Sequence, residues 1–361
     1  METYEKRRPG RRRRRRSRAL KITRLILTDL LFIALGLNAF ALHHVVLAAP
    51  EKTAPMALPT AELSPISTAE PTPAPETTEE PTEEPAEDEP SPEPTPTRVY
   101  SGVWGEKFAE HFTEGEVIAD ETSYRSENIS ITVTEVEEDG LLYHIADVYI
   151  SDLKYLRAGL GNGVYWAGTQ FTDEMARAND ALVAISGDHY TGRLEGVVVR
   201  NGVLYRETRF ADVCILGNDG VLRTVTDEEF DLEAVKEEGA WQVWSFGPML
   251  LQDGRAMTEF NSELTRANPR SAIGYYEPGH YCLVQVDGRI DRSRGMTLEE
   301  LSQLFETLGC TAAYNLDGGQ SSGFAWQGEL LSYPYGRKVS DIIYIAEVPE
   351  DGGESTEGGE G

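Results

Sequence analysis

Residues 312–323 read Ala-Ala-Tyr-Asn-Leu-Asp-Gly-Gly-Gln-Ser-Ser-Gly, an apolar run followed at once by polar residues and glycines. The run Ala312–Leu316 is typical of a buried strand. Side chains at the end of a strand are often used to build a site on a rigid scaffold. Gly318 and Gly319 allow backbone N–H groups to turn toward an anion, and Asp317 is then the natural acid, base or nucleophile. A plain Asp-Gly-Gly turn between two strands is the competing interpretation.

Short apolar runs like this one recur throughout residues 99–348, and turn dipeptides such as Asn201-Gly202 and Asp287-Gly288 separate many of them. Few of these runs alternate with helices. The sequence therefore predicts an α+β fold, a strand-rich mixed sheet with a few flanking helices. The expected strands are Ile129–Val136, Leu142–Ile150, Leu182–Ser186, Gly196–Arg200, Val213–Leu216, Trp241–Ser245, Ala272–Tyr276, Tyr281–Val286, Ala312–Leu316 and Asp341–Ala346.

Three helices are expected between these strands, and two of them begin with a capping box, in which a Thr and a Glu three residues later bond each other's backbone N–H. A glycine directly after a helical pattern predicts its end. The expected helices run from Thr172 to near Asn179, from the box Thr226–Glu229 to Gly239, and from the box Thr297–Glu300 to Gly309.

The charge of the chain is divided between a basic N-terminal tip and an acidic body, which together give the formal net charge of −28. Residues 1–24 are rich in Arg, whereas residues 25–47 contain no Lys or Arg and are long enough to span a bilayer. We expect a cytoplasmic tail, 1–24, and a signal anchor, 25–47, with the rest of the chain outside the membrane. A signal peptide cleaved after Ala49 is the alternative. The acidic body argues against nucleic acid as a partner.

Residues 48–98 are expected to form a disordered stalk. The stretch 50–97 holds 13 of the 19 prolines, and Thr, Glu and Ala fill most of the rest. Such a composition buries too little apolar surface to offset the entropy lost on ordering, and proline extends it. The Gly- and Glu-rich residues 349–361 are expected to be a disordered acidic tail, which leaves one folded domain at 99–348.

A serine-hydrolase interpretation of Gly319–Gly323, which matches the G-x-S-x-G pattern, can be excluded. That pattern needs a helix after the serine, and the catalytic histidine follows the serine in the chain. Residues 324–331 are typical of a strand and a turn instead. None of the six histidines lies downstream, since they are His43, His44, His111, His144, His189 and His280.

A second strand that ends in polar residues is Ala184–Tyr190, where Asp188 and His189 are candidate acid–base partners or metal ligands. One Asp–His pair is weak evidence for a metal site, and an ordinary turn is the alternative. Arg270 precedes a strand and suits a bidentate grip on phosphate, although a lone Arg is usually a surface charge.

Three cysteines, Cys214, Cys282 and Cys310, are too few and too scattered for a disulfide framework and are expected to be buried. Their spacing suggests no zinc site. We therefore expect no cofactor and no metal ligands, with a divalent cation as an open alternative.

Residues 150–346 resemble the phosphodiester glycosidases, a family that includes many bacterial exopolysaccharide-associated proteins. The resemblance rests on several segments in the family's order, of which Pro-Arg-Ser-Ala-Ile-Gly and Asn-Leu-Asp-Gly-Gly-x-Ser-Ser are the most specific. Two residues depart from the usual first motif: Ser186 replaces Asn, and His189 stands where an aromatic or small residue is common. The segments are Ser186–Tyr190, Gly196–Gly202, Ser245–Leu250, Pro269–Gly274, Met296–Leu301, Asn315–Ser322 and Gly336–Asp341.

This resemblance implies hydrolysis of the C1–O bond in a phosphate-linked glycan, with Asp317 and Asp188 as paired carboxylates and Arg270 on the phosphate. A glycan-binding module without activity, which Ser186 makes credible, and a metal-dependent phosphodiesterase that cleaves P–O are the alternatives. The residues expected to bind substrate are Gly187, His189, Tyr190, Asn315, Gly318, Gly319, Ser321, Ser322 and Arg337.

Overall fold

The structure is a computed structural model that describes residues 55–59 and 102–348. Its strands form three large sheets and one small hairpin. The seven-stranded sheet contains β2 (Ile118–Ala119), β3 (Ser123–Arg125), β4 (Ile129–Glu138), β5 (Leu141–Ile150), β15 (Arg270–Glu277), β16 (His280–Val286) and β17 (Ala312–Leu316). The six-stranded sheet contains β1 (Met56–Ala57), β8 (Val198–Arg200), β9 (Val203–Arg206), β10 (Val213–Leu216), β11 (Leu222–Val225) and β12 (Gln242–Trp244). The five-stranded sheet contains β6 (Leu156–Leu160), β7 (Val183–Ser186), β18 (Phe324–Trp326), β19 (Glu329–Leu330) and β20 (Asp341–Ile345), and the hairpin pairs β13 (Leu251–Gln252) with β14 (Arg255–Ala256).

The strand orders are β17-β15-β16-β5-β4-β3-β2, β1-β9-β8-β12-β10-β11 and β19-β18-β7-β20-β6. Within the described ranges every pairing in these sheets is antiparallel. The predicted strand-rich α+β class is therefore confirmed, but the predicted mixed sheet is wrong. Several neighbours are joined by tight turns, as β4 and β5 are at Asp139-Gly140, and a tight turn can only join antiparallel strands.

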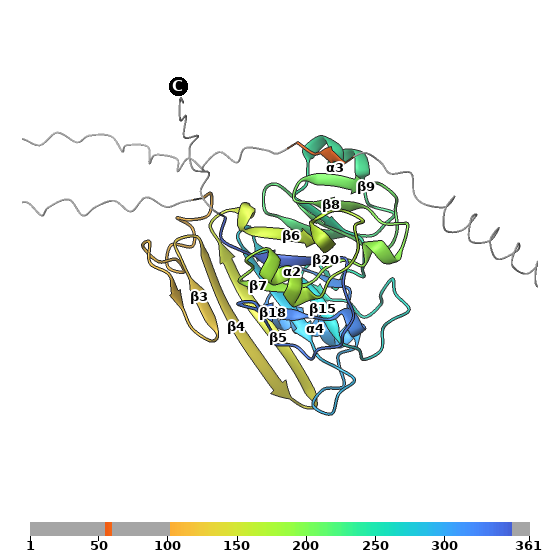
Figure 1. Cartoon of the computed structure of the whole chain (residues 1–361). Coiled ribbons are helices and arrows are strands. Elements are labelled where there is room, and N and C mark those ends of the chain that lie inside the picture. The colour runs from red at the N-terminus through yellow and green to blue at the C-terminus, as the bar shows by residue number, and fades with distance from the viewer. Residues whose placement is uncertain (1–54, 60–101, 349–361) are drawn as a thin grey trace, which may run out of the picture. The chain divides into compact units, whose positions relative to one another are not determined.

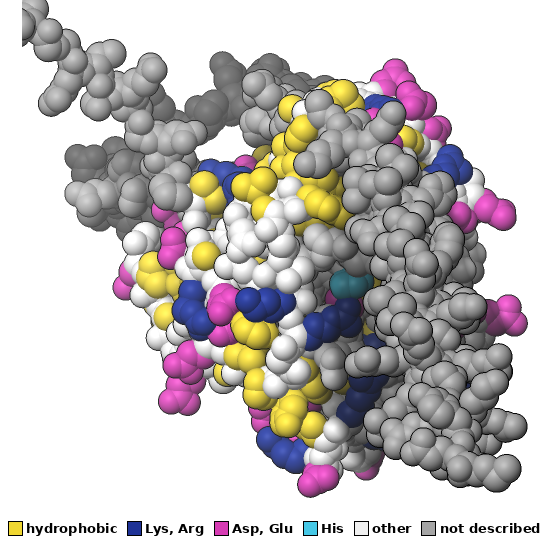
Figure 2. All heavy atoms as spheres, turned by 45° about the vertical axis from the view of Figure 1, so that its right-hand side comes forward, with side chains coloured by type: hydrophobic (Ala, Val, Ile, Leu, Met, Phe, Trp, Pro, Cys, Tyr) yellow, Lys and Arg dark blue, Asp and Glu magenta, His cyan; other side chains and the backbone are white. Residues whose placement is uncertain are grey.

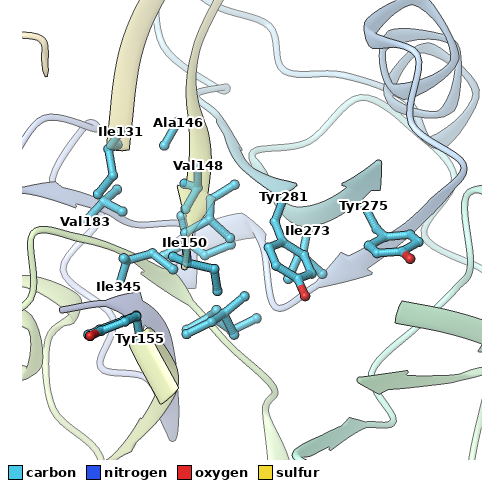
Figure 3. Close-up of a cluster of buried hydrophobic side chains, with 14 of the residues drawn as sticks. Ile131, Ala146, Val148, Ile150, Tyr155, Val183, Ile273, Tyr275, Tyr281 and Ile345 are labelled. Carbon is cyan, nitrogen blue, oxygen red and sulfur yellow. The ribbon is translucent and has the colours of Figure 1, made fainter. Parts of the chain in front are cut away.

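The main core lies between the seven-stranded and five-stranded sheets (Figures 1 and 3). Side chains along β5 alternate between the two faces of the sheet, so Ala146, Val148 and Ile150 share one face. There they pack in one cluster with Val183 of β7 and Ile345 of β20. Residues of the opposite face pack in a second cluster beneath the helix α4. The seven-stranded sheet is thus apolar on both faces at its centre, which holds the ends of β15 and β17 rigidly in place.

The helix α4 (Leu298–Leu308) begins and ends where the sequence predicts. Thr297 and Glu300 form the capping box, and Gly309 ends the helix with a left-handed φ of 84°. The shorter α2 (Thr172–Ala178), which packs on β7 and β20, also matches its prediction.

The prediction for α3 (Leu232–Glu238) is wrong at its start. Thr226 and Glu229 do exchange the hydrogen bonds of a capping box, but they close only a turn. The buried ring of Phe230 follows that turn, and the carboxylate of Asp231 then accepts hydrogen bonds from the N–H groups of Glu233 and Ala234 to start the helix. A second cap after the turn therefore replaces the first.

Within the predicted stalk, the structure describes residues 55–59, and these residues pair with the domain. Met56 and Ala57 pair with Leu204 and Val203 of β9, and the N–H of Leu58 donates to the carbonyl of Gly202 at 2.8 Å. Leu58 is buried in the apolar cluster of the six-stranded sheet. The predicted span 25–47 lies outside the described residues, and none of the helices within 55–59 and 102–348 has the length and apolarity to cross a bilayer.

Candidate functional site

Two strand ends that the sequence singles out, those of β7 and β17, meet in the structure. The N–H of Asp317 donates to the carbonyl of Gly187 at 2.9 Å. Ser186 Oγ lies 2.7 Å from Ser271 Oγ and donates to the carbonyl of Asp317 at 2.8 Å. Ser186 is fully buried, so its hydroxyl joins three strands beneath the site. The departure from Asn at this position therefore changes the support of the site and not its surface.

Asp317 is a nearly buried carboxylate beside a partly exposed histidine. His189 Nδ1 lies 3.4 Å from Asp317 Oδ2, and that oxygen has no hydrogen-bond partner among the described residues. Burial raises the pKa of Asp317, and His189 opposes the rise. Arg337 Nη2 lies 3.1 Å from His189 Nε2. The same Arg337 nitrogen lies 3.4 Å from His189 Nδ1, so the guanidinium contacts both ring nitrogens, and His189 contacts both Arg337 and Asp317.

Asp317 opens into a pocket of about 250 Å³, called here the arginine pocket because Arg270, Arg289 and Arg337 line it. None of the three guanidinium groups pairs with a carboxylate of the described residues at ion-pair distance. Figure 2 shows several Lys and Arg side chains below and beside a histidine near the middle of the face in view. Three cations around one carboxylate form a site that attracts an anion.

Arg270 is held firmly by backbone carbonyl groups. Its Nε donates to Met296 at 3.1 Å, and its Nη2 donates to Leu264 at 2.8 Å and Arg266 at 2.7 Å. Burial, with a smaller contribution from Arg289, lowers the pKa of Arg270 to about 10, so it stays charged at neutral pH. Only Nη1 is left for a ligand, which corrects the predicted two-pronged grip on phosphate.

Asp188 is completely buried and saturated with partners. It forms ion pairs with Arg193 and with Arg200 (3.4 Å), and it accepts from the N–H of Ser245 at 3.1 Å. Burial by itself would raise the pKa of Asp188, but the two arginines outweigh it and hold that pKa below its usual range. Asp188 does not line the arginine pocket, so the structure does not bring it to a substrate there as the partner of Asp317.

Arg200 is shared with a second buried carboxylate. Its Nε donates to Asp341 Oδ2 at 2.7 Å, while Asp341 Oδ1 accepts from the N–H of Asp188 at 2.7 Å. Burial raises the pKa of Asp341 to about 7 against the effect of Arg200. A Cβ at Gly187 would lie 2.8 Å from that carboxyl group, so only glycine fits there. Gly187 therefore supports the site from behind.

Several other residues that were predicted to bind substrate form hydrogen bonds within the protein instead. The N–H of Gly319 donates to the carbonyl of Pro269 at 2.8 Å, which corrects the prediction that this amide binds phosphate. Tyr190 is buried with its hydroxyl on the carbonyl of Ser340, and the side-chain N–H of Asn315 donates to the carbonyl of Gly247. Ser322 Oγ donates to the carbonyl of Arg270. These residues shape the site from within.

The predicted contacts that do face a pocket are Gly318, Gly319, Ser321, Ser322 and Arg337. Sequence reasoning missed Arg193, Arg200, Asp341 and Arg289 as site residues. A signal existed for Arg200, because an arginine inside the apolar stretch 196–202 needs a buried carboxylate as partner. No group of three His, Cys, Asp or Glu side chains that could hold a metal is found within 55–59 and 102–348.

Comparison with known proteins shows which family the domain is similar to. Residues 179–346 match the profile of the phosphodiester glycosidases. A prophage-derived uncharacterized protein of Bacillus subtilis (strain 168) is 32% identical over 190 residues, which covers 49% of this chain and 29% of that protein. The N-acetylglucosamine-1-phosphodiester alpha-N-acetylglucosaminidase of Bos taurus is 36% identical over 205 residues, covering 48% of this chain and 38% of the enzyme. The chain thus spans well under half the length of these relatives.

A solved structure shares the fold. The catalytic domain of the zebrafish enzyme of the same name, auto-inhibited by its pro-peptide, has a TM-score of 0.50 at 22% identity and covers 61% of this chain and 83% of that one.

Proposed function

We infer, from the match of residues 179–346 to the profile of the phosphodiester glycosidases, that this chain hydrolyses the C1–O bond of a sugar-1-phosphate diester. The products are a free sugar and a phosphomonoester. The arginine pocket carries the proposal, since it places three guanidinium groups, none in an ion pair with a carboxylate of the described residues, beside one carboxylate. A phosphodiester is a compact anion that such donors bind well.

Asp317 is the reacting carboxylate in this proposal. It is the carboxylate that lines the arginine pocket, and its raised pKa suits a base that takes a proton from the attacking water. His189 beside it can relay that proton. Phosphate is a good leaving group, so stabilisation of its charge by Arg270, Arg289 and Arg337 replaces a strong general acid.

Heavy-oxygen labelling tests the proposal directly. The protein is incubated with a panel of N-acetylglucosamine-1-phosphate diesters in heavy-oxygen water, and mass spectrometry locates the label. We expect the label in the sugar. A label in the phosphate, together with loss of product formation after treatment with a chelator, would establish a metal-dependent phosphodiesterase instead. Binding of the diester without any product would identify a glycan-binding module.

We further propose that the substrate is a phosphate-linked glycan of the cell surface or an exopolysaccharide, and that residues 25–47 anchor the enzyme beside it. The hydropathy of that segment and the basic residues before it support the anchor.

A further inference from the structure

A second pocket adjoins the arginine pocket on the other side of the turn Gly319–Ser321. It has a volume of about 240 Å³ and shares Gln320 and Arg337 with its neighbour. We call it the tyrosine pocket, because Tyr333 and Tyr335 form one of its walls.

The tyrosine pocket differs chemically from the arginine pocket. Phe171, Tyr333 and Tyr335 contribute aromatic rings, and Arg337 is the one cation in its lining. Asp173 also lines it, but this carboxylate is paired with Arg177 at 2.6 Å. The pocket is therefore nearly neutral and aromatic, which does not suit a phosphate.

Its aromatic wall is rigid. Tyr335 Oη accepts from the N–H of Gly288 at 2.7 Å and donates to the carbonyl of Gly288 at 2.9 Å. The N–H of Tyr333 donates to the buried carboxylate of Asp287 at 3.1 Å. The ring of Tyr333 packs edge-on against Tyr335 with centroids 5.1 Å apart, and Tyr333 as a residue is 47% exposed. One ring face is thus preorganised for a ligand.

A buried hydroxyl without a well-placed hydrogen-bond partner also lines this pocket. Ser321 is 2% exposed, and its Oγ makes no hydrogen bond of good geometry among the described residues, although it lies near the carboxylate of Asp317 and lowers the pKa of that group. A buried polar atom left unsatisfied in this way costs free energy, unless a ligand completes its hydrogen bond. A ligand with hydroxyl groups and an apolar ring face would satisfy both Ser321 and Tyr333.

We propose that the tyrosine pocket binds the pyranose ring of the substrate while the arginine pocket binds its phosphate. This assignment rests on the proposed function. A sugar-1-phosphate that fills both pockets places its C1–O–P linkage over Gln320 and Arg337, the residues that the pockets share. Arg337 then lies beside the bridging oxygen, where charge develops as the C1–O bond breaks.

Binding of the two halves of the substrate tests the assignment without any turnover. The probes are inorganic phosphate and the methyl α-pyranosides of N-acetylglucosamine, N-acetylgalactosamine, glucose, galactose and mannose, titrated into the full chain by ligand-detected NMR. We expect at least one glycoside to bind. Tyr333→Ala and Ser321→Ala should weaken that glycoside by about tenfold and leave the affinity for phosphate within twofold. Arg289→Gln should weaken the binding of phosphate by about tenfold and leave the affinity for the glycoside within twofold.

Leu331→Ala is the matched control, because Leu331 is 40% exposed nearby and lines neither pocket. It should change neither affinity, and equal thermal midpoints will show that the variants fold. The assignment is overturned if no glycoside binds, or if Tyr333→Ala and Ser321→Ala weaken phosphate instead. Separate binding of the two halves in a protein that cleaves no diester would refute only the proposed function. Cleavage that continues while Tyr333→Ala leaves glycoside affinity unchanged would refute only the pocket assignment.

Discussion

Asp188 and Asp317 follow neighbouring strand ends, but their surroundings give them opposite properties. Two arginines hold Asp188 ionised inside the protein, whereas Asp317 is desolvated, lacks an arginine partner at ion-pair distance and reaches the arginine pocket. Asp317→Asn keeps the shape of the side chain and removes the base. We expect turnover of the diester to fall at least about 100-fold, with phosphate still bound. An unchanged rate would show that Asp317 is not the reacting group.

Asp188→Asn should mainly lower the free energy of unfolding. The substitution leaves Arg193 and Arg200 with one buried carboxylate fewer, and breaking a buried ion pair from one side costs about 3–5 kcal/mol. Urea denaturation followed by tryptophan fluorescence measures this loss. Asp317→Asn is the matched control, because it makes the same chemical change at the end of the neighbouring strand. Equal stability of the two variants would contradict the distinction drawn between the carboxylates.

The raised pKa of Asp317 also predicts how stability depends on pH. Because the folded state favours the protonated acid, the stability that this group contributes is complete below its unfolded pKa, about 4, and is lost as the pH rises through the folded pKa. Asp317→Asn should therefore have a higher thermal midpoint than the parent at pH 7.5. The difference should vanish near pH 3. A lower midpoint for the variant at pH 7.5 would mean that the ionised carboxylate stabilises the fold.

At the scale of elements, the sequence predicts correctly those strands and helix ends that are determined by neighbouring residues. Each expected strand is found, and α4 starts at its capping box because Leu298, Leu301 and Phe305 then all face the core. The start of α3 is missed because the burial of Phe230 competes with the local cap, and burial is a long-range interaction. The short strand β1 lies in a stretch whose composition indicates disorder, and pairing with the edge of β9 together with the burial of Leu58 orders it.

That strand can be tested through Leu58, whose side chain is buried against the six-stranded sheet. Leu58→Ser in the full chain should lower the unfolding free energy by about 1.5–3 kcal/mol, the value of burying a leucine. Hydrogen exchange should also become faster at the N–H of Val203 or Leu204 on β9. Leu63→Ser, in the same proline-rich stretch, is the control. If both variants behave alike, residues 55–59 do not stay on the domain in solution.

At the scale of the whole molecule, the candidate site could be predicted only in part. Asp317 and Arg337 are recognisable within their motifs, and Arg270 within its own, but the two pockets exist only once these segments meet. Tyr333 lies in a loop without any periodic signal, and its place is set by Asp287, 46 residues away in the chain. Contacts of this kind depend on tertiary packing, which a single sequence does not specify.

The orientation of the chain across the membrane is the prediction on which access to substrate depends. Twelve Lys and Arg in residues 1–24 precede the apolar segment 25–47, and positive charge is retained on the cytoplasmic side. The domain should therefore lie outside. Protease added to intact cells should remove an epitope tag placed after Gly361 and spare one placed before Met1. After lysis both tags should be lost. If the C-terminal tag survives in intact cells, the domain faces the cytoplasm, and a cell-surface glycan cannot be its substrate. If both tags survive in intact cells and high salt extracts the protein from the membrane fraction, the segment 25–47 is not an anchor. The proposed enzymatic activity would then rest on the site alone.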